Sequence, residues 1–252
     1  MPVRRIPKNY CSLTGQVAST KRVASGLNGG RAAFESSLER DLLILLDFDP
    51  EVLCYEEQPV RIDYVDAGGC RRRYTPDVLV RWRCDGVSAS GMRPLLAEVK
   101  YRATLRKDWA DLKPRFRAAR LEGRARGWRF RILTEVEVRT PYLRNAKFLS
   151  PYRRLARDGA SVNSILTTLH QLRESDPEML LGTLARDLRK RAGLIPTLWH
   201  LVATRKVGLD LSLPLTMRSC LWSLDLEQGD DVSANSPTLR QRLAGRTRGA
   251  QR

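Results

Sequence analysis

The chain has 252 residues, of which 42% are hydrophobic and 29% are charged, a composition that excludes a disordered protein. No apolar run approaches the roughly 18–20 residues that a membrane-spanning helix needs. The formal charge of +17, from 45 Lys and Arg against 28 Asp and Glu, favours a polyanionic partner, most simply nucleic acid. An arginine-rich composition imposed by a GC-rich genome is the alternative explanation of this charge.

Cysteine and histidine are too few and too scattered for a zinc site. The five cysteines form no C-x-x-C pair, which also argues against a disulfide framework and favours a reducing cytoplasm. The first residues, "MPVRRIPKNY", contain no apolar signal-peptide core, so export is not expected. Because the only histidines are His170 and His200, any metal site must depend on carboxylates.

The first third of the chain predicts an arm, a helix and a hairpin. Residues 1–30 are rich in Gly, Ser and basic side chains, which predicts a flexible basic arm. From Gly30, the spacing of apolar residues in "RAAFESSLERDLLILLDFDP" predicts a helix that ends before Pro50. The stretch "EVLCYEEQPVRIDYV", in which apolar and charged residues alternate from Val60, predicts a half-buried strand, which the turn at 66–69 joins to "RRRYTPDVLVRW" in a hairpin.

The next segments complete an α/β pattern. A loop with Gly86 and Gly91 precedes the strand "PLLAEVKY", a basic helix is expected at about 105–126, and "WRFRILTEVEV" predicts a further strand. This order predicts a mixed sheet flanked by helices, and we assign it to a domain of residues 31–145.

The C-terminal half follows a different pattern. After a polar helical connector at 141–160, helices are expected at about 161–173, 177–191 and 195–205, followed by two short strands that bend at Pro214. Three helices and a β-hairpin predict a winged-helix-like α+β domain over 146–226, with the third helix in the recognition position. The polar, Gly- and Arg-rich segment 227–252 predicts a disordered tail.

Charged residues stand where buried strands should carry none. Asp77 follows Pro76, and Glu98 and Lys100 are two apart in "LLAEVKY", so that both point to the same face of the strand. If these strands are neighbours, two carboxylates and an ammonium converge, and oxygen ligands of this kind suit Mg²⁺. The pattern is short, and a surface ion pair with an Asp turn would explain it equally well. Glu35 and Glu39, four apart on the expected helix, offer a third carboxylate.

Taken in order, "ESSLERDLLILLDFDPEVLCYEEQPVRI", "YTPDVLV" and "LLAEVKY" resemble the TnsA-type endonuclease subunit of heteromeric transposases. The resemblance covers about residues 30–225 and implies a restriction-endonuclease-like core of the PD-(D/E)xK type. It is far more specific than the P-D and E-x-K pairs alone. Some members carry Gln where this chain has Glu98, and the carboxylate is common in the wider superfamily.

The resemblance assigns roles to individual residues. It implies a catalytic set of Glu39, Asp77, Glu98 and Lys100. It also implies that the carboxylates and the backbone carbonyl of Val99 hold Mg²⁺, with two ions expected and Mn²⁺ as a substitute. Gln58 in "EEQP" either supports the site or hydrogen-bonds the strand, and the structural role is favoured. His200 is expected to be partly buried rather than catalytic.

The function implied by the resemblance is cleavage of the 5′ ends of a transposable element during cut-and-paste transposition. Its implied partners are the transposon-end DNA, an integrase-type transposase that processes the 3′ ends, and an ATPase regulator. The implied location is the prokaryotic cytoplasm, at the nucleoid. Two alternatives remain: a stand-alone repair or restriction nuclease, and a non-catalytic DNA-binding subunit with a relic nuclease domain. The third C-terminal helix, "IPTLWHLVATRK", has few base-reading side chains, so it contacts either DNA or protein.

A basic segment follows the E-x-K pair. From Lys100 to Arg131 there are twelve basic residues against three acidic ones. Phosphate contacts from such a segment give affinity without sequence reading. We therefore expect the DNA backbone to be lined by Lys107, Lys113, Arg117, Arg120 and Arg124. A solvated helix face is the alternative.

Overall fold

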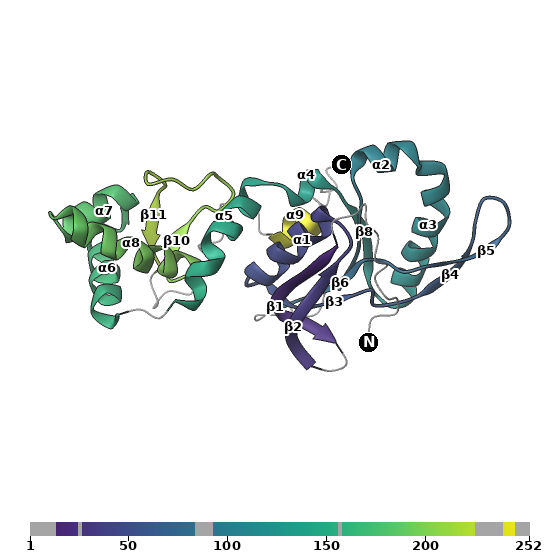
Figure 1. Cartoon of the computed structure of the whole chain (residues 1–252), viewed down its shortest axis with the longest axis horizontal. Helices are drawn as coiled ribbons and strands as arrows, with labels where there is room; N and C mark the ends of the chain where they lie inside the picture. The colour runs from purple at the N-terminus through teal and green to yellow at the C-terminus, as the bar shows by residue number, and fades with distance from the viewer. Residues whose placement is uncertain (1–13, 25–26, 84–92, 156–157, 225–238, 245–252) are drawn as a thin grey trace, which may run out of the picture. The chain divides into compact units, whose positions relative to one another are not determined.

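The computed structural model describes residues 14–24, 27–83, 93–155, 158–224 and 239–244. The chain divides into two compact units, Met1–Arg139 with Leu239–Arg252, and Thr140–Thr238 (Figure 1). The start of the expected arm, the glycine loop at 86–91 and most of the expected tail lie outside the described residues. Among the helices of the described part, none combines the length and apolar character needed to cross a membrane.

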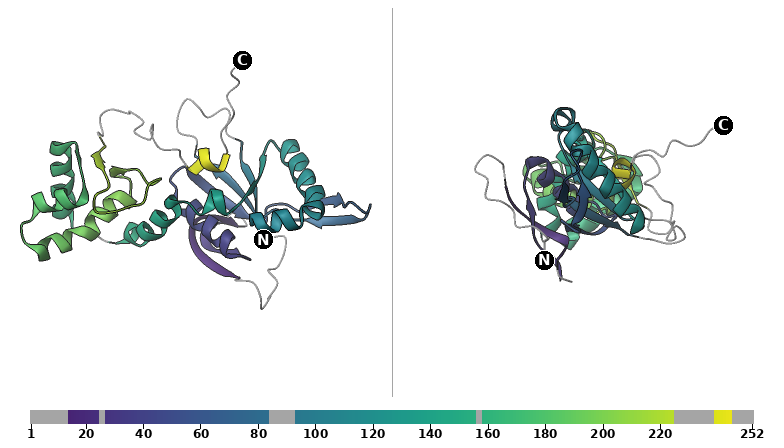
Figure 2. Two further views of the ribbon diagram at one scale, coloured as in Figure 1. Left: turned by 90° about the horizontal axis from the view of Figure 1, so that it is seen from above. Right: turned by 90° about the vertical axis from the view of Figure 1, so that its right-hand side faces the viewer.

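The first unit is built on a six-stranded mixed sheet in the order β2-β1-β3-β6-β7-β8 (Figures 1 and 2). β1 and β3 run parallel, as do β7 and β8, and the other neighbouring pairs are antiparallel. The strands are β1 (Gly15–Ala24), β2 (Leu27–Phe34), β3 (Val52–Glu57), β6 (Val78–Trp82), β7 (Leu95–Val99) and β8 (Arg129–Leu133).

The expectation of a flexible arm over 1–30 is wrong for the described part of that segment. β1 and β2 form an antiparallel hairpin, and Arg22 of β1 pairs with Tyr55 of β3, so the hairpin is part of the sheet. Gly29 and Gly30 have φ of +89° and +98°, a conformation that glycine adopts without strain. These glycines therefore allow the backbone conformation of β2 at this point and do not indicate a flexible arm.

The first helix begins later than its apolar pattern indicates. α1 spans Ser37–Phe48, with Ser36 as its N-cap, so the expected start at Gly30 is wrong. Residues before Ser36 belong to β2 and its connection to the helix, and Glu35 is therefore not on the helix. The Ser36 side chain accepts a hydrogen bond from the Glu39 backbone N–H, which satisfies one of the free donors of the first turn.

The predicted hairpin after residue 60 is confirmed for β4 (Ile62–Val65) and β5 (Arg71–Tyr74), which pair as a separate two-stranded ribbon. Its expected second strand is wrong beyond Tyr74, because Val78–Trp82 is the separate strand β6 of the main sheet. The basic helix is split into α2 (Arg102–Lys107) and α3 (Trp109–Ala125). A cluster of buried apolar side chains joins α3 to the ribbon and the sheet, and consists of Val60, Ile62, Tyr74, Leu79, Leu96, Leu112, Phe116 and Ala119. This packing fixes α3 and the ribbon beside β6 and β7.

The end of the expected strand "WRFRILTEVEV" is helical instead. β8 ends at Leu133, and α4 (Glu135–Val138) follows at once. Thr134 and Glu137 form a capping box, in which side chains satisfy the backbone donors at the helix start. A local capping signal thus overrides the alternating pattern.

The expectation of disorder over 227–252 is wrong for residues 239–244. These residues form α9 (Leu239–Ala244), which belongs to the first unit. Leu239 and Leu243 are buried, and the Arg131 side chain donates a 2.8 Å hydrogen bond to the Leu243 carbonyl. Two buried leucines four residues apart are enough to hold this single helical turn on the first unit.

Within the described residues, the second unit contains four α-helices, a 3₁₀ helix and a three-stranded sheet. Its elements are α5 (Pro141–Leu149), a 3₁₀ helix η2 (Ser150–Arg154), α6 (Gly159–Leu172), β9 (Glu174–Ser175), α7 (Pro177–Leu184), α8 (Leu188–Ala203), β10 (Val207–Leu209) and β11 (Leu221–Ser223). The strand order is β10-β11-β9. The expected boundary between the last two helices is wrong, because α8 begins at Leu188 and contains Pro196.

Candidate active site

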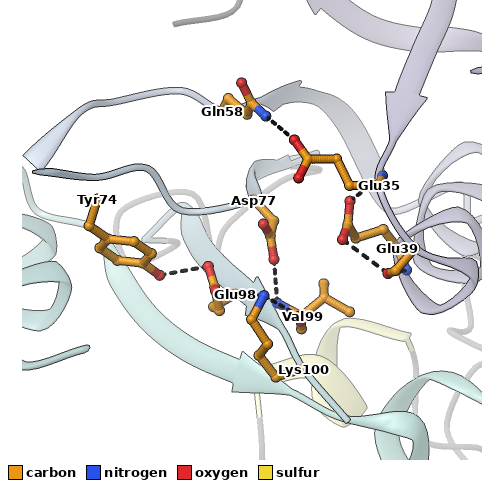
Figure 3. Close-up of polar contacts among 9 residues, drawn as sticks. Glu35, Glu39, Gln58, Tyr74, Asp77, Glu98, Val99 and Lys100 are labelled. Atoms are coloured by element: carbon orange, nitrogen blue, oxygen red, sulfur yellow. Dashed lines mark hydrogen bonds and ion pairs between the residues drawn. The ribbon is translucent and has the colours of Figure 1, made fainter. Parts of the chain in front are cut away.

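The sheet brings Asp77 and Glu98 together. β6 and β7 are antiparallel neighbours with Val78 opposite Ala97, so Asp77, immediately before β6, lies beside the second half of β7. The Asp77 carboxylate accepts a 2.7 Å hydrogen bond from the Val99 backbone N–H through Oδ2 (Figure 3). Its other oxygen, Oδ1, accepts no hydrogen bond from the described part of the chain, and is therefore available to a ligand.

Glu98 is buried, with 2% of its surface exposed, and both of its oxygens are engaged. Oε2 accepts a 2.6 Å hydrogen bond from the Tyr74 hydroxyl, and Oε1 forms a 3.0 Å ion pair with Lys100 Nζ. Burial first, and then the charge of Glu98, raise the pKa of Tyr74 above its usual value, so the phenol keeps its proton and acts as a donor. The carboxylate is thus held between a neutral donor and a cation.

Lys100 follows β7 directly. Its backbone N–H donates to Leu133 of β8 at 3.0 Å, and its Nζ donates to the Val99 carbonyl at 3.2 Å. Burial alone would lower the pKa of Lys100, but the neighbouring carboxylates, Glu98 most strongly, raise it above its usual value. The side chain is therefore a fixed positive charge at neutral pH.

Glu39 reaches the site from the first turn of α1. Its Oε2 accepts a 2.8 Å hydrogen bond from the Glu35 backbone N–H, and its Oε1 accepts one of 3.0 Å from the Ser36 hydroxyl. Burial raises the pKa of Glu39, although these two hydrogen bonds act in the opposite direction. In this structure the Glu39 carboxylate is bonded to the chain at the start of the helix, and the residue lines the cavity described below.

Gln58 contacts two segments of the site. Its backbone, with φ of +50°, donates a 2.9 Å hydrogen bond to the Asp77 carbonyl, and its side chain donates to Glu35 Oε1 at 3.3 Å. The residue therefore links the end of β3 to the segment that carries Asp77 and to the carboxylate that precedes α1.

One cavity of about 340 Å³ collects these groups, and Figure 3 shows how they approach it. All four residues of the expected catalytic set line it, namely Glu39, Asp77, Glu98 and Lys100. The other lining residues are Glu35, Arg61, Arg73, Tyr74, Thr75 and Arg115. Burial, followed by the charge of Glu98, raises the pKa of Asp77 well above its usual range, although Lys100 and the Val99 N–H act in the opposite direction.

The donor set suits a hard divalent cation with few protein ligands. Within the described residues, no group of three or more His, Cys, Asp or Glu side chains is close enough to hold a metal ion by itself. Mg²⁺ commonly uses only one or two carboxylates and completes its shell with water and substrate phosphate. Asp77 and Glu98 fit that requirement, since they lie together and Asp77 keeps one free oxygen. The Val99 carbonyl already accepts a hydrogen bond from Lys100.

The five basic residues expected to contact DNA are all exposed, and none of them lines the cavity. From α3 only Arg115 does so. Sequence reasoning missed Tyr74, although it stands three residues before Asp77 in "YTPD", and it missed Arg61 and Arg73 on the ribbon. The sequence signal that could have found Arg73 and Tyr74 is the run "RRRY", in which three arginines and a tyrosine lie shortly before the Pro-Asp pair.

The fold and the site together define the class of protein. The mixed sheet flanked by helices fits a restriction-endonuclease-like core, and an aspartate, a glutamate and a lysine lie where β6 and β7 meet.

The comparison with protein families identifies the particular type of nuclease domain. Residues 49–135 match the family described as TnsA-like endonuclease N terminal, and this range contains Gln58, Asp77, Glu98 and Lys100 but not Glu39. Residues 49–135 are therefore a TnsA-like endonuclease N-terminal domain, and the resemblance inferred from the motifs is confirmed over this segment. A comparison with curated proteins gives no match.

Proposed function

We propose that this protein is a metal-dependent DNA endonuclease subunit of a heteromeric transposase. The observation that carries the proposal is the meeting of Asp77, Glu98 and Lys100 in one cavity, within the segment that matches the TnsA-like domain. The net charge of +17 supports DNA as the substrate.

Each residue of the cavity has a distinct role in this proposal. Asp77 and Glu98 hold the cation through carboxylate oxygens, and Glu39 contributes from α1. Lys100 is fixed by its ion pair with Glu98 and presents positive charge to the phosphate that is cut. Tyr74 keeps the Glu98 carboxylate in place through its 2.6 Å hydrogen bond.

Mg²⁺, or Mn²⁺ in its place, would activate water and neutralise the charge that develops on the phosphate. The second ion expected from the resemblance stays a prediction, as does the Val99 carbonyl as a ligand. In the structure this carbonyl accepts a 3.2 Å hydrogen bond from the Lys100 ammonium, which leaves its second lone pair for a cation.

The test combines metal binding with DNA cleavage. Asp77→Asn and Glu98→Gln should each reduce Mg²⁺-dependent cleavage of a labelled duplex by at least about 100-fold, since each weakens charge stabilisation in the site. Lys100→Ala should lose cleavage but retain Mn²⁺ binding, measured by calorimetry. Asp111→Asn is the matched control, because Asp111 is an exposed carboxylate of the same unit that does not line the cavity.

Wild-type rates in either carboxylate variant would refute the site, and so would cleavage that survives EDTA. An equal loss of metal binding and cleavage in Lys100→Ala would make the lysine structural. If Asp111→Asn were as impaired as the other variants, the effects could not be assigned to the cavity.

The TnsA-like domain supports a more specific role, cleavage at the 5′ ends of a transposable element. An integrase-type transposase and an ATPase regulator are the partners that this role requires. The alternative, a stand-alone repair or restriction nuclease, requires neither. Cleavage of a DNA carrying transposon ends, assayed with and without an integrase-type transposase, separates the two. Specific 5′ cleavage only in the presence of the transposase supports the subunit role, and equal cleavage without it supports the alternative.

We also infer that the second unit is winged-helix-like. The order α6, β9, α7, α8, β10, β11, with β11 between β10 and β9, supports this inference. α8 occupies the recognition position. Because it begins at Leu188, it includes the exposed Arg189 and Lys190, which the expected helix of 195–205 did not contain. Binding of the isolated transposon-end DNA by Arg189→Glu, compared with wild type, tests whether α8 contacts DNA; unchanged binding favours a protein partner.

A further inference from the structure

Three arginines line the same cavity as the proposed catalytic residues. Arg61 immediately precedes β4, Arg73 lies on β5 and Arg115 lies on α3, so three separate segments supply them. Together with Lys100 they place four cations around a cavity that also holds four carboxylates: Glu35, Glu39, Asp77 and Glu98.

Among the described residues, these arginines form few direct ion pairs. Within the described residues, Arg61 and Arg115 form no ion pair. Arg73 has one at 3.7 Å with Asp63, where the two side chains are 72% and 81% exposed, and such exposed pairs contribute little. Each guanidinium is therefore available to an anion from outside.

Arg115 is held in position without using up its donors. Its guanidinium carbon lies 5.5 Å from the centre of the Tyr74 ring and 5.4 Å from that of Phe116. Its Nε is buried and has no hydrogen-bond partner within the structure. Stacking of this kind orients the planar group, and the N–H donors along its edge match the oxygens of a phosphate.

The charge of the cavity explains why a nuclease needs these side chains. Without the arginines, four carboxylates and one lysine would repel a DNA strand before any cation was bound. With the three arginines, the four positive side chains of the cavity equal its four carboxylates in number. The arginines come from the ribbon, the residue just before it, and α3, whereas Glu39 comes from α1.

We propose that Arg61, Arg73 and Arg115 bind the backbone phosphates next to the one that is cut, and so seat the DNA strand across the base of the β4–β5 ribbon. This inference rests on the proposed nuclease function and adds to it the path of the strand. It differs from the path expected along the exposed face of α3, because Arg117 lies about 200° around the helix from Arg115.

The experiment measures DNA binding in EDTA, where a metal-dependent nuclease cannot cut. Fluorescence anisotropy with a labelled duplex gives the affinity at several salt concentrations. The variants are Arg61→Gln with Arg73→Gln together, and Arg115→Gln alone. Arg129→Gln is the matched control, since Arg129 is exposed on β8 opposite Leu95, whereas Glu98 pairs with Ile132.

Each lost phosphate contact should reduce the slope of log affinity against log salt by about 0.9. We expect at least this loss in the double variant and a similar loss in Arg115→Gln, with wild-type slope in Arg129→Gln. Thermal unfolding checks folding, and the double variant decides the matter if Arg115→Gln is unstable, because Arg61 and Arg73 are exposed.

Wild-type slopes in the cavity variants would overturn this inference and leave the nuclease function standing. An equal loss in Arg129→Gln would also overturn it, since the effect would then come from overall charge. Absence of DNA binding by the wild-type protein at every salt concentration would instead contradict the proposed function itself. The two failures are therefore distinguishable.

Discussion

Removing the hydroxyl of Tyr74 is the sharpest test of how the site is held together. Tyr74→Phe keeps the ring, which packs at its edge against Phe116 with 6.3 Å between the ring centres and carries Arg115 on its face. The change removes the 2.6 Å hydrogen bond to Glu98 and leaves a buried carboxylate whose one remaining side-chain partner among the described residues is Lys100. The perturbation is therefore confined to one oxygen atom.

The expected cost follows from burial. A hydrogen bond to a charged group contributes about 1.5–3 kcal/mol, and both partners here are buried, with 6% of Tyr74 and 2% of Glu98 exposed. For a chain of this length, each kcal/mol corresponds to about 2–4 °C in Tm. We therefore expect Tyr74→Phe to unfold roughly 3–12 °C below wild type. If Glu98 holds a cation, the loss of this supporting contact should also weaken Mn²⁺ binding about 10- to 100-fold.

Thermal unfolding without metal measures the change in Tm, urea denaturation measures the change in unfolding free energy, and calorimetric titration with Mn²⁺ measures the metal affinity. Tyr64→Phe is the control, because Tyr64 lies on the same ribbon and its hydroxyl makes no hydrogen bond with the described residues. A loss of less than about 0.5 kcal/mol in Tyr74→Phe, the range of an ordinary surface change, would refute the reasoning. A stability loss with unchanged Mn²⁺ affinity would make Tyr74 a packing residue and not a positioning residue.

Two further predictions concern residues at the edges of the cavity. Glu39→Gln should impair cleavage far more than Glu35→Gln in the same assay, since the resemblance assigns the ligand to Glu39; the reverse ranking would give that role to the residue before the helix. Neutralising three exposed arginines of α3 should weaken binding to any duplex and lower the salt slope by about 0.9 per phosphate contact, whereas an unchanged slope would assign them to a solvated face. The three are Arg117, Arg120 and Arg124.

The sequence was sufficient to predict the residues whose position depends on strand periodicity. The spacing of Glu98 and Lys100 placed them on one face of a strand, and the 3.0 Å ion pair between them agrees. The neighbouring position of Asp77 needed an assumption about strand pairing, which the antiparallel register of β6 and β7 bears out. These predictions succeeded because a strand in a core has few alternatives for its side chains.

The errors occurred where a local hydrogen bond or a distant contact decides the structure. The apolar pattern placed Glu35 on the helix, but the capping of α1 by Ser36 excludes it. The tail looked disordered because its composition is polar, yet Leu239 and Leu243 bury against the first unit. Contacts of this kind join segments far apart in the sequence, and no periodicity within one segment reports them.

Tyr74 joins the two halves of the site. Its hydroxyl holds the carboxylate proposed to bind the cation, and its ring orients an arginine proposed to bind the neighbouring phosphate. Because one side chain makes both contacts, the phenol ring lies between the Glu98 carboxylate and the Arg115 guanidinium. A strand bound by Arg115, as proposed, would then lie close to Glu98, and such positioning is what cleavage at a defined phosphate requires. Tyr74 ends β5, and Asp77 follows it by three residues, immediately before β6. One short stretch of chain therefore supplies both the residue that supports Glu98 and a carboxylate proposed to bind the cation.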